Sequence, residues 1–352
     1  MLQHWRSCSL SPSILPEMPR RAVVLMNLGG PDSLTAVRAF LYNLFSDPAI
    51  IGLPTPLRLP LAWLIAVRRS RTARGIYAQL GGASPLLINT EAQARALEVA
   101  LGPEYRCFVA MRYWHPLTAA AVGAVKAWQP EEIVLLPLYP QFSTTTTASS
   151  LEAWRREAIR QGLVGKTRAI RSYPVAEGFV AALAALVADS LDAAEDKAAG
   201  GPVRLLLSAH GLPLKIVAAG DPYPREIEST AAAVASALAR PGLDWRVCFQ
   251  SRVGPLAWLG PSVEEELRRA GREGVAIVIA PISFVSEHSE TLVELDRDYH
   301  RLAQACGVPA YHRVPTVGTD RRFIAALADL VRGTEPAAQP AETTAARAET
   351  TS

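Results

Sequence analysis

Short apolar runs alternate with helical patterns along most of the chain. Residues 22–28 form an apolar, β-branched run that stops at two glycines and a proline. Apolar residues at helical spacing follow between 37 and 44, and Asp32 or Ser33 can cap the helix that they predict. Further apolar runs predict strands at 106–111, 132–136, 168–172, 203–209, 245–250, 275–282 and 310–314. Helical patterns between and after the later strands lie at 225–239, 263–270, 290–305 and 322–331.

The order of these elements predicts the fold class. Apolar strands that alternate with helices are typical of parallel sheets covered on both faces. Because the series occurs twice, we predict an α/β protein with two doubly wound, Rossmann-like domains. The first spans 21–175 and the second 176–333, with a boundary near 173–178. Residues 1–20 and 334–352 lack periodic apolar positions, and we expect disordered extensions there.

Composition narrows the class of protein without giving a function. The chain has 352 residues, of which 49% are hydrophobic and 20% charged, so it can bury sizeable cores. Its net charge of +3 gives no electrostatic footprint for nucleic acid. Its 4 cysteines form no CxxC pair, which is typical of a reduced, cytoplasmic protein with no disulfide framework and no zinc site. The longest apolar run, at 61–67, is too short to span a membrane.

The carboxyl ends of the predicted strands are where a ligand site is expected in doubly wound folds, here in a cleft between the two domains. The strand at 203–209 leads into His210, whose side chain can reach such a cleft, and Gly211 suggests a sharp turn of the backbone there. A hydrogen-bonded structural histidine is the alternative, and position alone does not separate the two. The first strand end, Gly29-Gly30-Pro31, matches no nucleotide-binding pattern and predicts a tight turn.

A row of acids follows the strand at 275–282. Its members are Glu287, Glu290, Glu294 and Asp298. Because the spacings are close to one helical turn, we expect the four carboxylates to share one helical face. A solvated stripe near a helix N-terminus is the alternative. Since the row begins directly at a strand end, we favour a role in the cleft, guiding a divalent cation inward and carrying protons outward.

His210 and Glu290 together offer one imidazole and one carboxylate, a pair suited to a first-row divalent metal. Structural and catalytic zinc sites use three or four protein ligands, so two protein ligands make a poor permanent site. Two ligands do suit a metal that is a substrate and must leave.

Two further segments carry candidate chemistry. Arg112 and Tyr113 follow another strand, and an arginine in a cleft suits a ligand carboxylate, although the aromatic ring can equally belong to the core. The stretch 53–71 is apolar and ends in arginines, and we expect its prolines to interrupt regular helix at its start. It can lie on a membrane surface or accept an apolar ligand with acidic tails, and packing on the core is the alternative.

Longer motifs resemble those of a known protein family. The chain resembles the ferrochelatases over about residues 21–332, in the motifs NLGGPDSL, GGASPL, MRYWHPLT, LYPQFSTTTTASS, SAHGLP, GDPYP, QSRVGPLAWLGP and PISFVSEHSETLVELD. The resemblance implies a lyase that inserts Fe²⁺ into protoporphyrin IX, releasing two protons and giving protohaem at the last step of haem biosynthesis. It also implies a chelatase-like fold with the porphyrin between two Rossmann-like domains.

The resemblance extends to individual residues. His210 matches the family's active-site histidine and Glu290 its essential glutamate, which implies catalytic and metal-binding roles for both. The metal and proton relay would comprise Glu287, His288, Glu294 and Asp298. Porphyrin contacts are implied for Leu28, Arg68, Tyr77, Ser84, Arg112, Tyr113, Trp258 and Phe284. Of these, Arg68 and Ser84 match positions that hold propionates.

Departures from the family pattern resemble a bacterial-type enzyme. Animal members have serine where this chain has Gly211, and mitochondrial members have aspartate at the position of Glu287. Animal members also ligate a 2Fe–2S cluster through cysteines, whereas Thr144 occupies the internal position here. We therefore expect no such cluster and no permanent cofactor.

The expected partners are protoporphyrin IX and Fe²⁺ as substrates, with no nucleic acid. We expect a cytoplasmic protein with at most weak, peripheral contact with the inner membrane. A coproporphyrin ferrochelatase, or a non-catalytic carrier of porphyrin or metal with the same fold, are the alternatives.

Overall fold

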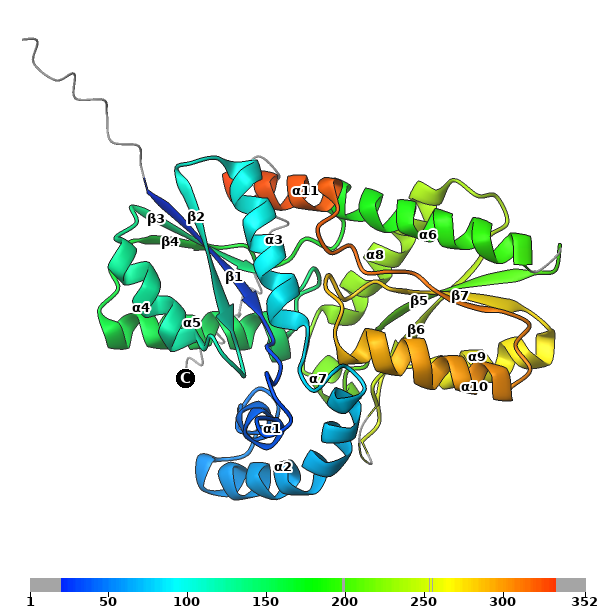
Figure 1. Ribbon diagram of the computed structural model, residues 1–352, viewed down its shortest axis with the longest axis horizontal. Helices are drawn as coiled ribbons and strands as arrows, with labels where there is room; N and C mark the ends of the chain where they lie inside the picture. The colour runs from blue at the N-terminus through cyan, green and yellow to red at the C-terminus, as the bar shows by residue number, and fades with distance from the viewer. Residues whose placement is uncertain (1–19, 198–199, 253, 255, 334–352) are drawn as a thin grey trace, which may run out of the picture.

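Two parallel four-stranded sheets lie beside each other, with helices around them (Figure 1). The computed structural model describes residues 20–197, 200–252, 254 and 256–333. The segments expected to be disordered lie outside this range, apart from Arg20. The predicted α/β class with two doubly wound sheets is confirmed.

The first sheet contains β1 (Arg21–Asn27), β2 (Tyr105–Met111), β3 (Glu132–Pro137) and β4 (Lys166–Ala169), all parallel and in the order β2–β1–β3–β4. Helices α4 (Thr118–Trp128) and α5 (Ser149–Gln161) cover one face, and α3 (Leu86–Leu101) lies on the other. Successive residues of β1 serve opposite faces, because Val23 packs with α3 and Val24 with α4.

The second sheet repeats this order as β6–β5–β7–β8. Its parallel strands are β5 (Val203–His210), β6 (Asp244–Gln250), β7 (Ala276–Pro281) and β8 (Tyr311–Arg313). One face is covered by α9 (Val263–Glu273), the π-helix η2 (Glu290–Tyr299) and α10 (His300–Ala305), and the other by α6 (Glu177–Lys197) and α8 (Tyr223–Leu238). The repeat predicted from the sequence is therefore a repeat of topology.

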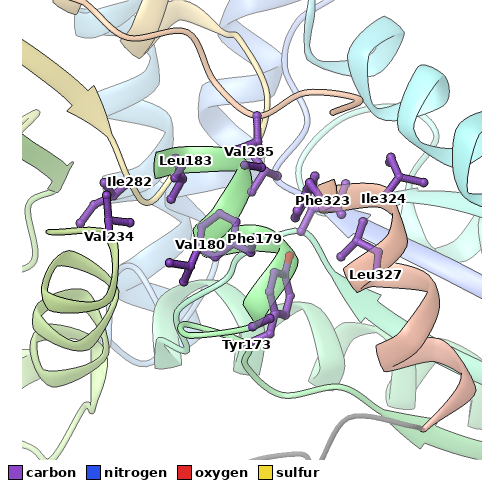
Figure 2. Packing of buried hydrophobic residues seen from close by; sticks show 14 of the residues in the cluster. Tyr173, Phe179, Val180, Leu183, Val234, Ile282, Val285, Phe323, Ile324 and Leu327 are labelled. Carbon is purple, nitrogen blue, oxygen red and sulfur yellow. The ribbon is translucent and has the colours of Figure 1, made fainter. Parts of the chain in front are cut away.

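One apolar cluster joins the two sheets. Helix α11 (Arg321–Arg332) packs against both α3 and α6. Figure 2 shows Phe179 of α6 next to Phe323 of α11, with ring centroids 5.8 Å apart. Gly178 permits this approach, since a Cβ atom there would clash with the carbonyl oxygen of Arg322. Burying a phenylalanine contributes roughly 1.5–3 kcal/mol, so the two units stabilise each other through a shared core.

Buried polar side chains reinforce the junction. Gln93 of α3 donates to the carbonyl oxygens of Val285 and Gly318 at 2.8 and 2.9 Å. Asp221, before α8, accepts hydrogen bonds from the backbone and hydroxyl of Thr144 at 2.7 and 2.6 Å. Both Gln93 and Asp221 are buried, and a buried group left without its partner would cost about 1–3 kcal/mol. The strand ends of the two sheets are therefore held in a defined relative position.

Helices α1 (Val37–Phe45) and α2 (Thr55–Ala78) pack on each other and lie below the first sheet in Figure 1. The expectation that prolines interrupt this segment is wrong: Pro54 is the N-cap, Pro56 lies in the first turn, and Pro60 is carried inside the continuous helix. Across the described ranges, none of the helices is both long and apolar enough to cross a bilayer.

Three other predictions need correction. Strand β4 covers 166–169, so it begins and ends earlier than the predicted strand at 168–172. The residue at the N-cap of α1 is Ala36, so neither Asp32 nor Ser33 caps that helix, although Ser33 Oγ accepts from the Ala36 N–H at 3.3 Å. The single helix expected over 290–305 is a π-helix followed by α10. Apolar spacing does not reveal whether backbone hydrogen bonds close after four or five residues, which is why the pattern missed this difference.

Candidate active site

The carboxyl ends of β5 and β7 bring together the residues expected to carry chemistry. Strand β5 ends at His210, and its neighbour β7 leads into 282–289. The His210 N–H donates to Ser283 Oγ at 3.2 Å, and Tyr223 Oη donates to the His210 carbonyl oxygen at 3.1 Å. The backbone on both sides of the imidazole is thus held by hydrogen bonds.

His210 and Glu290 form a hydrogen-bonded pair, with Nδ1 2.8 Å from Oε2. Their side chains are 42% and 27% exposed, so a ligand can reach both. Burial disfavours the charged imidazole, but the Glu290 carboxylate outweighs it and raises the pKa of His210. Burial likewise opposes ionisation of Glu290, and the His210 charge outweighs it and lowers the pKa of Glu290. The carboxylate therefore stabilises a proton on His210 while Nε2 faces away from Glu290.

His288 and Phe284 adjoin this pair. His288 Nε2 is 4.0 Å from Glu290 Oε2, and Nδ1 is 3.1 Å from the Ser286 carbonyl oxygen, to which it donates because a carbonyl only accepts. Burial lowers the pKa of His288, which favours a neutral ring. The Phe284 ring contacts both imidazoles edge-on, with centroids 6.5 Å from His210 and 4.5 Å from His288.

Tyr77 of α2, a residue of the first unit, lies close to Glu290 of the second. Tyr77 is 8% exposed, and burial raises the pKa of Tyr77 to about 12, an effect that the nearby Ser289 side chain opposes. The Glu290 charge raises it further. A neutral phenol from α2 thus stands beside the pair formed by β5 and η2.

Glu294 lies further along η2 and is held by the end of β6. Its oxygens accept from the Ser251 N–H at 2.9 Å, from Ser251 Oγ at 2.5 Å and from Gln250 Nε2 at 3.1 Å. Burial and the Glu290 charge together raise the pKa of Glu294. Two carboxyl groups of the row therefore differ in proton affinity, since the pKa of Glu290 is lowered and that of Glu294 is raised.

The prediction that all four acids share one helical face is wrong. Glu287 precedes η2, and its Oε1 accepts from Arg313 at 2.6 Å and from the Thr316 N–H at 3.0 Å. Burial opposes ionisation of Glu287, but the Arg313 guanidinium outweighs it and holds the pKa of this carboxyl below its usual range. Asp298 has a side chain 53% exposed and lies 3.8 Å from Arg301. Spacing alone could not show where the helix starts or that an arginine from β8 faces its first acid.

Arg112 follows β2, as expected, but its guanidinium forms an ion pair with Asp47 of the same chain. Its Nη2 lies 2.6 Å from Asp47 Oδ2 and its Nε donates to Ser149 Oγ at 2.8 Å. Tyr113 is 1% exposed and donates to the same Asp47 oxygen at 2.8 Å. The side chains of Arg112 and Asp47 are 16% and 2% exposed. Contacts of Arg112 and Tyr113 with a porphyrin stay predictions, and they compete with this enclosed cluster.

Comparison with known proteins shows to which family the chain belongs. The ferrochelatase family model matches residues 20–335. The chain belongs to the ferrochelatase family. The ferrochelatase of Caulobacter vibrioides strain NA1000 / CB15N is 54% identical over 318 residues, covering 88% of this chain and 89% of that protein. The ferrochelatase of Wolbachia sp. subsp. Drosophila simulans strain wRi is 49% identical over 315 residues, covering 88% and 98%.

Among solved structures, SirB from Bacillus subtilis with Fe³⁺ shares the fold, with a TM-score of 0.50 and 14% identity over 91% of this chain and 96% of that one. Such a low identity shows the fold alone. The family and fold predicted from the motifs are confirmed. As a ferrochelatase, the chain is an enzyme of the lyase class and acts in haem biosynthesis.

The positions at which ferrochelatase resemblance implies ring contacts fall around the same strand ends. Leu28 and Tyr77 join the apolar cluster of α1 and α2. Trp258 pairs with Pro213 in an isolated bridge close to His210, and its Nε1 is buried with no hydrogen-bond partner among the described residues. These positions are compatible with a ring held beside His210, and their contacts with porphyrin stay predictions.

The two positions implied for propionates differ from each other. Arg68 is exposed on α2, and within the described part of the chain it makes no hydrogen bond or ion pair. Ser84 precedes α3, where its Oγ accepts from the Leu86 N–H at 3.3 Å. It also lies so close to Gly30 that a Cβ atom there would clash with its hydroxyl, which explains the second glycine of the first strand end.

Gly211, which follows His210, is needed for space. Its φ is not positive, so the sharp turn that the glycine suggested is not the reason for it. A Cβ atom at this position would lie 2.9 Å from the Gln250 carbonyl oxygen and 3.3 Å from the Trp258 ring. The close approach of β5 to β6 and to Trp258 therefore selects glycine.

No group of three His, Cys, Asp or Glu side chains that could hold a metal ion occurs within residues 20–197, 200–252, 254 and 256–333. Among these residues His210 and Glu290 therefore stand as a pair, and a metal-binding role for them stays a prediction. Sequence reasoning gave no role to Asp47, which neutralises Arg112, or to Ser251, which joins the two carboxyl groups on η2. An acid between apolar helices was the available signal for Asp47, and no local pattern marked Ser251.

Proposed function

We propose that this ferrochelatase inserts Fe²⁺ into protoporphyrin IX at the His210–Glu290 pair, giving protohaem and two protons. The observation that carries the proposal is the 2.8 Å contact between His210 Nδ1 and Glu290 Oε2 at the exposed end of β5. Free protoporphyrin carries two hydrogens on its central nitrogens. A dication can enter the ring only as these two protons leave, so the site needs a base beside the macrocycle.

His210 acts as that base. Nδ1 is engaged with Glu290, so Nε2 is the nitrogen that meets the ring. When Nε2 takes a pyrrole proton, the carboxylate of Glu290 stabilises the imidazolium that forms. A single lone pair cannot hold iron and a proton together, so His210 serves the proton, while the exposed oxygens of Glu290 draw the incoming Fe²⁺.

Binding at the edge of the ring drives its distortion. The walls are Leu28, Tyr77, Trp258 and Phe284. Arg68 and Ser84 hold propionates, and the Arg112–Tyr113–Asp47 cluster stabilises the first unit. Because the nitrogen lone pairs must tilt out of the ring plane before iron can enter, binding energy from these contacts offsets the strain. Further residues of the row contribute to the electrostatic field in which iron arrives and protons leave. These are His288, Glu287, Glu294 and Asp298.

The protein works in the cytoplasm and touches the inner membrane weakly through α2. Leu57, Trp63 and Leu64 of that helix are 62%, 58% and 37% exposed, and Arg68 follows on the same helix. Exposed apolar side chains next to cations suit an anionic lipid surface. Sedimentation with anionic phospholipid vesicles should show binding that falls at high salt and on changing Trp63 and Leu64 to serine; binding that survives both would place the contact elsewhere.

No resident cofactor takes part. The position where a cluster-bearing relative needs a thiolate is Thr144, whose hydroxyl bonds Asp221 at 2.6 Å across the junction of the two units. A hydroxyl cannot replace a thiolate as an iron–sulfur ligand. Absorption spectra and iron–sulfide analysis of protein purified without oxygen test this: a stoichiometric cluster would contradict the proposal.

The decisive experiment is an anaerobic assay of the purified chain with excess Fe²⁺ and either protoporphyrin IX or coproporphyrin. We expect many turnovers with protoporphyrin, measured as loss of porphyrin fluorescence and gain of haem absorption. A stoichiometric, single event would support a carrier, and a large preference for coproporphyrin would identify the other substrate.

A further inference from the structure

The backbone of His210 is held from two sides by side chains of neighbouring elements. On one side, Tyr223 Oη donates to the His210 carbonyl oxygen at 3.1 Å. On the other side, the His210 N–H donates to Ser283 Oγ at 3.2 Å. Tyr223 begins α8, and Ser283 follows β7. Since side chains make both contacts, the position of the imidazole depends on where these two residues are held.

The Ser283 side is fixed by Gln141, which belongs to the first unit and follows β3. Gln141 Nε2 donates to the carbonyl oxygen of Ile282, the residue before Ser283, at 3.1 Å. The same nitrogen donates to Thr230 Oγ1 of α8 at 2.9 Å. Gln141 and Thr230 are both buried, so these bonds lie in the interior of the protein. One amide thus ties the first unit to both elements that hold His210.

The Tyr223 side is fixed by Asp221, whose two carboxylate oxygens serve one helix in each unit. Oδ1 accepts from the Tyr223 N–H at 3.0 Å, at the first residue of α8. Oδ2 accepts from the N–H and the hydroxyl of Thr144 at 2.7 and 2.6 Å, at the start of the π-helix η1 (Thr144–Ala148) of the first unit. These N–H groups have no partner within their own helices. Because Asp221 is buried and bonded on both sides, it fixes Tyr223 relative to η1.

We propose that Tyr223 is a positioning residue for His210, and that Asp221 and Gln141 tie this arrangement to the first unit. The inference rests on the proposed function, in which the ring lies between the two units. A base on the second unit must then be placed accurately relative to the walls that the first unit contributes. Hydrogen bonds from the first unit to both sides of His210 provide that placement. Tyr223 acts through His210 and takes no part in proton or metal transfer.

A purely structural role of the same bonds leads to a different expectation. If the Tyr223 hydroxyl only stabilised the junction, its removal would lower the melting temperature and leave the turnover of the folded enzyme unchanged. If it positions His210, its removal lowers kcat, because displacing a catalytic group by about an ångström can cost up to about 10²-fold. KM for the porphyrin stays constant, since the walls and the propionate partners are untouched.

Tyr223→Phe is the decisive variant, because it removes one hydroxyl and keeps the buried ring. Tyr173→Phe is the matched control, since Tyr173 is also buried and its Oη donates to the Pro137 carbonyl oxygen, at the end of β3, at 3.1 Å. In the anaerobic assay we expect kcat of Tyr223→Phe to fall about tenfold, with KM for protoporphyrin unchanged. Tyr173→Phe should keep wild-type kcat.

Crystal structures of the wild type and the two variants test the displacement itself. In Tyr223→Phe the distance from His210 Nδ1 to Glu290 Oε2 should be longer than in the wild type, and in Tyr173→Phe it should be the same. A fall in kcat without a displacement of the imidazole would overturn the positioning role.

Asp221→Asn tests the tie to the first unit. The amide has one acceptor oxygen instead of two, so it cannot serve Thr144 and Tyr223 together. We expect kcat to fall, and the double variant with Tyr223→Phe to lose little more than Tyr223→Phe alone, because residues that act through one another are not additive. Losses that multiply in the double variant would contradict the tie.

Wild-type kcat in a folded Tyr223→Phe, or a change confined to KM, would also overturn the positioning role. Either result, beside a wild type that completes many turnovers, would leave the proposed function intact. Failure of the wild type itself to turn over would instead contradict the proposed function.

Discussion

The two units share a strand order but differ in the residues at the carboxyl ends of their strands. After β2, Arg112 meets Asp47, and their side chains are 16% and 2% exposed. At the end of β5, His210 meets Glu290, and these side chains are 42% and 27% exposed. Both places pair a nitrogen-bearing side chain with a carboxylate. The first pair is enclosed by protein, whereas the second is partly exposed and open to a ligand.

The comparison suggests that the exposure of a charged pair, rather than its presence, distinguishes a pair that stabilises the fold from one that is available to a ligand. An enclosed pair loses much stability when one partner is removed, because the other charge stays buried. An open pair loses little stability, because water can solvate what is left. Substitutions at the two places should therefore affect different measurements.

His210→Ala should have the largest effect on activity. We expect metal insertion to fall by up to about 10⁴-fold, the upper range for a general acid–base group. The melting temperature should stay close to wild type because the imidazole is partly exposed. A folded variant with near-wild-type turnover would remove His210 from the mechanism.

Asp47→Ala should be the most destabilising change. It leaves Arg112 without its carboxylate, and breaking such a buried pair costs about 3–5 kcal/mol in the free energy of unfolding. Urea denaturation measures the loss, and Asp298→Ala, which removes an exposed carboxylate, is the control. Equal stability of the two variants would show that the enclosed cluster does not support the first unit.

The Asp47 pair also predicts a pH dependence. Burial opposes ionisation of Asp47, but the Ser149 and Arg112 contacts outweigh it and hold the pKa of this carboxyl below its usual range. A depressed pKa means that the stabilisation is present above the unfolded pKa and is lost as pH falls through the folded one. The stability difference between wild type and Asp47→Asn should therefore shrink below about pH 4. A difference that stays constant down to about pH 2 would contradict this.

Glu290→Gln keeps the shape of the side chain and removes its charge. We expect kcat to fall by roughly 10²–10³-fold with little change in porphyrin affinity, because the carboxylate acts on the proton and the metal. Steady-state kinetics with the porphyrin varied separates the two quantities. An effect confined to KM would show that Glu290 only helps to bind the ring.

Arg68→Ala should have a moderate effect that depends on the ligand. An exposed guanidinium that pairs with a propionate contributes up to about 1 kcal/mol, so affinity for the free acid should fall several-fold more than affinity for the methyl ester. Arg112→Ala should weaken both forms alike, since Asp47 already meets its charge. Fluorescence titration measures both, and equal losses for acid and ester in Arg68→Ala would exclude a propionate contact.

Removing residues 1–20 and 334–352 should have the smallest effect. Neither segment has the periodic apolar positions needed to dock on a core. Activity and melting temperature should match the full chain. A large fall in melting temperature would show that one of the segments packs.

Most of the fold could be predicted from the sequence. Apolar strands such as 203–209 and 275–282 were found to within a residue or two, because each is bounded by turn residues and buried on both faces. The first strand end was correctly predicted as a glycine turn, with φ 86° at Gly29. The kind of helix in η2 could not be predicted, because its side-chain pattern fits either a four- or a five-residue hydrogen bond.

The site could be predicted only in part. Strand ends and a family resemblance pointed to His210 and Glu290, and the structure places their side chains 2.8 Å apart, while their roles stay predictions. The placement of Glu287 was not predicted, because its partner Arg313 comes from a strand 26 residues away. Arg112 posed the same problem, because Asp47 lies 65 residues before it.

The sequence by itself therefore determined the α/β class, the repeated series of strands and helices, and the family, and it pointed to His210 and Glu290, since these depend on local periodicity and on contiguous motifs. The tertiary structure decided which charges are free. Asp47 encloses Arg112, Arg313 takes Glu287, and Ser251 joins Glu290 to Glu294. Coulombic and hydrogen-bonding partners act over a few ångströms in space, and the chain reaches those distances only after distant segments have packed together.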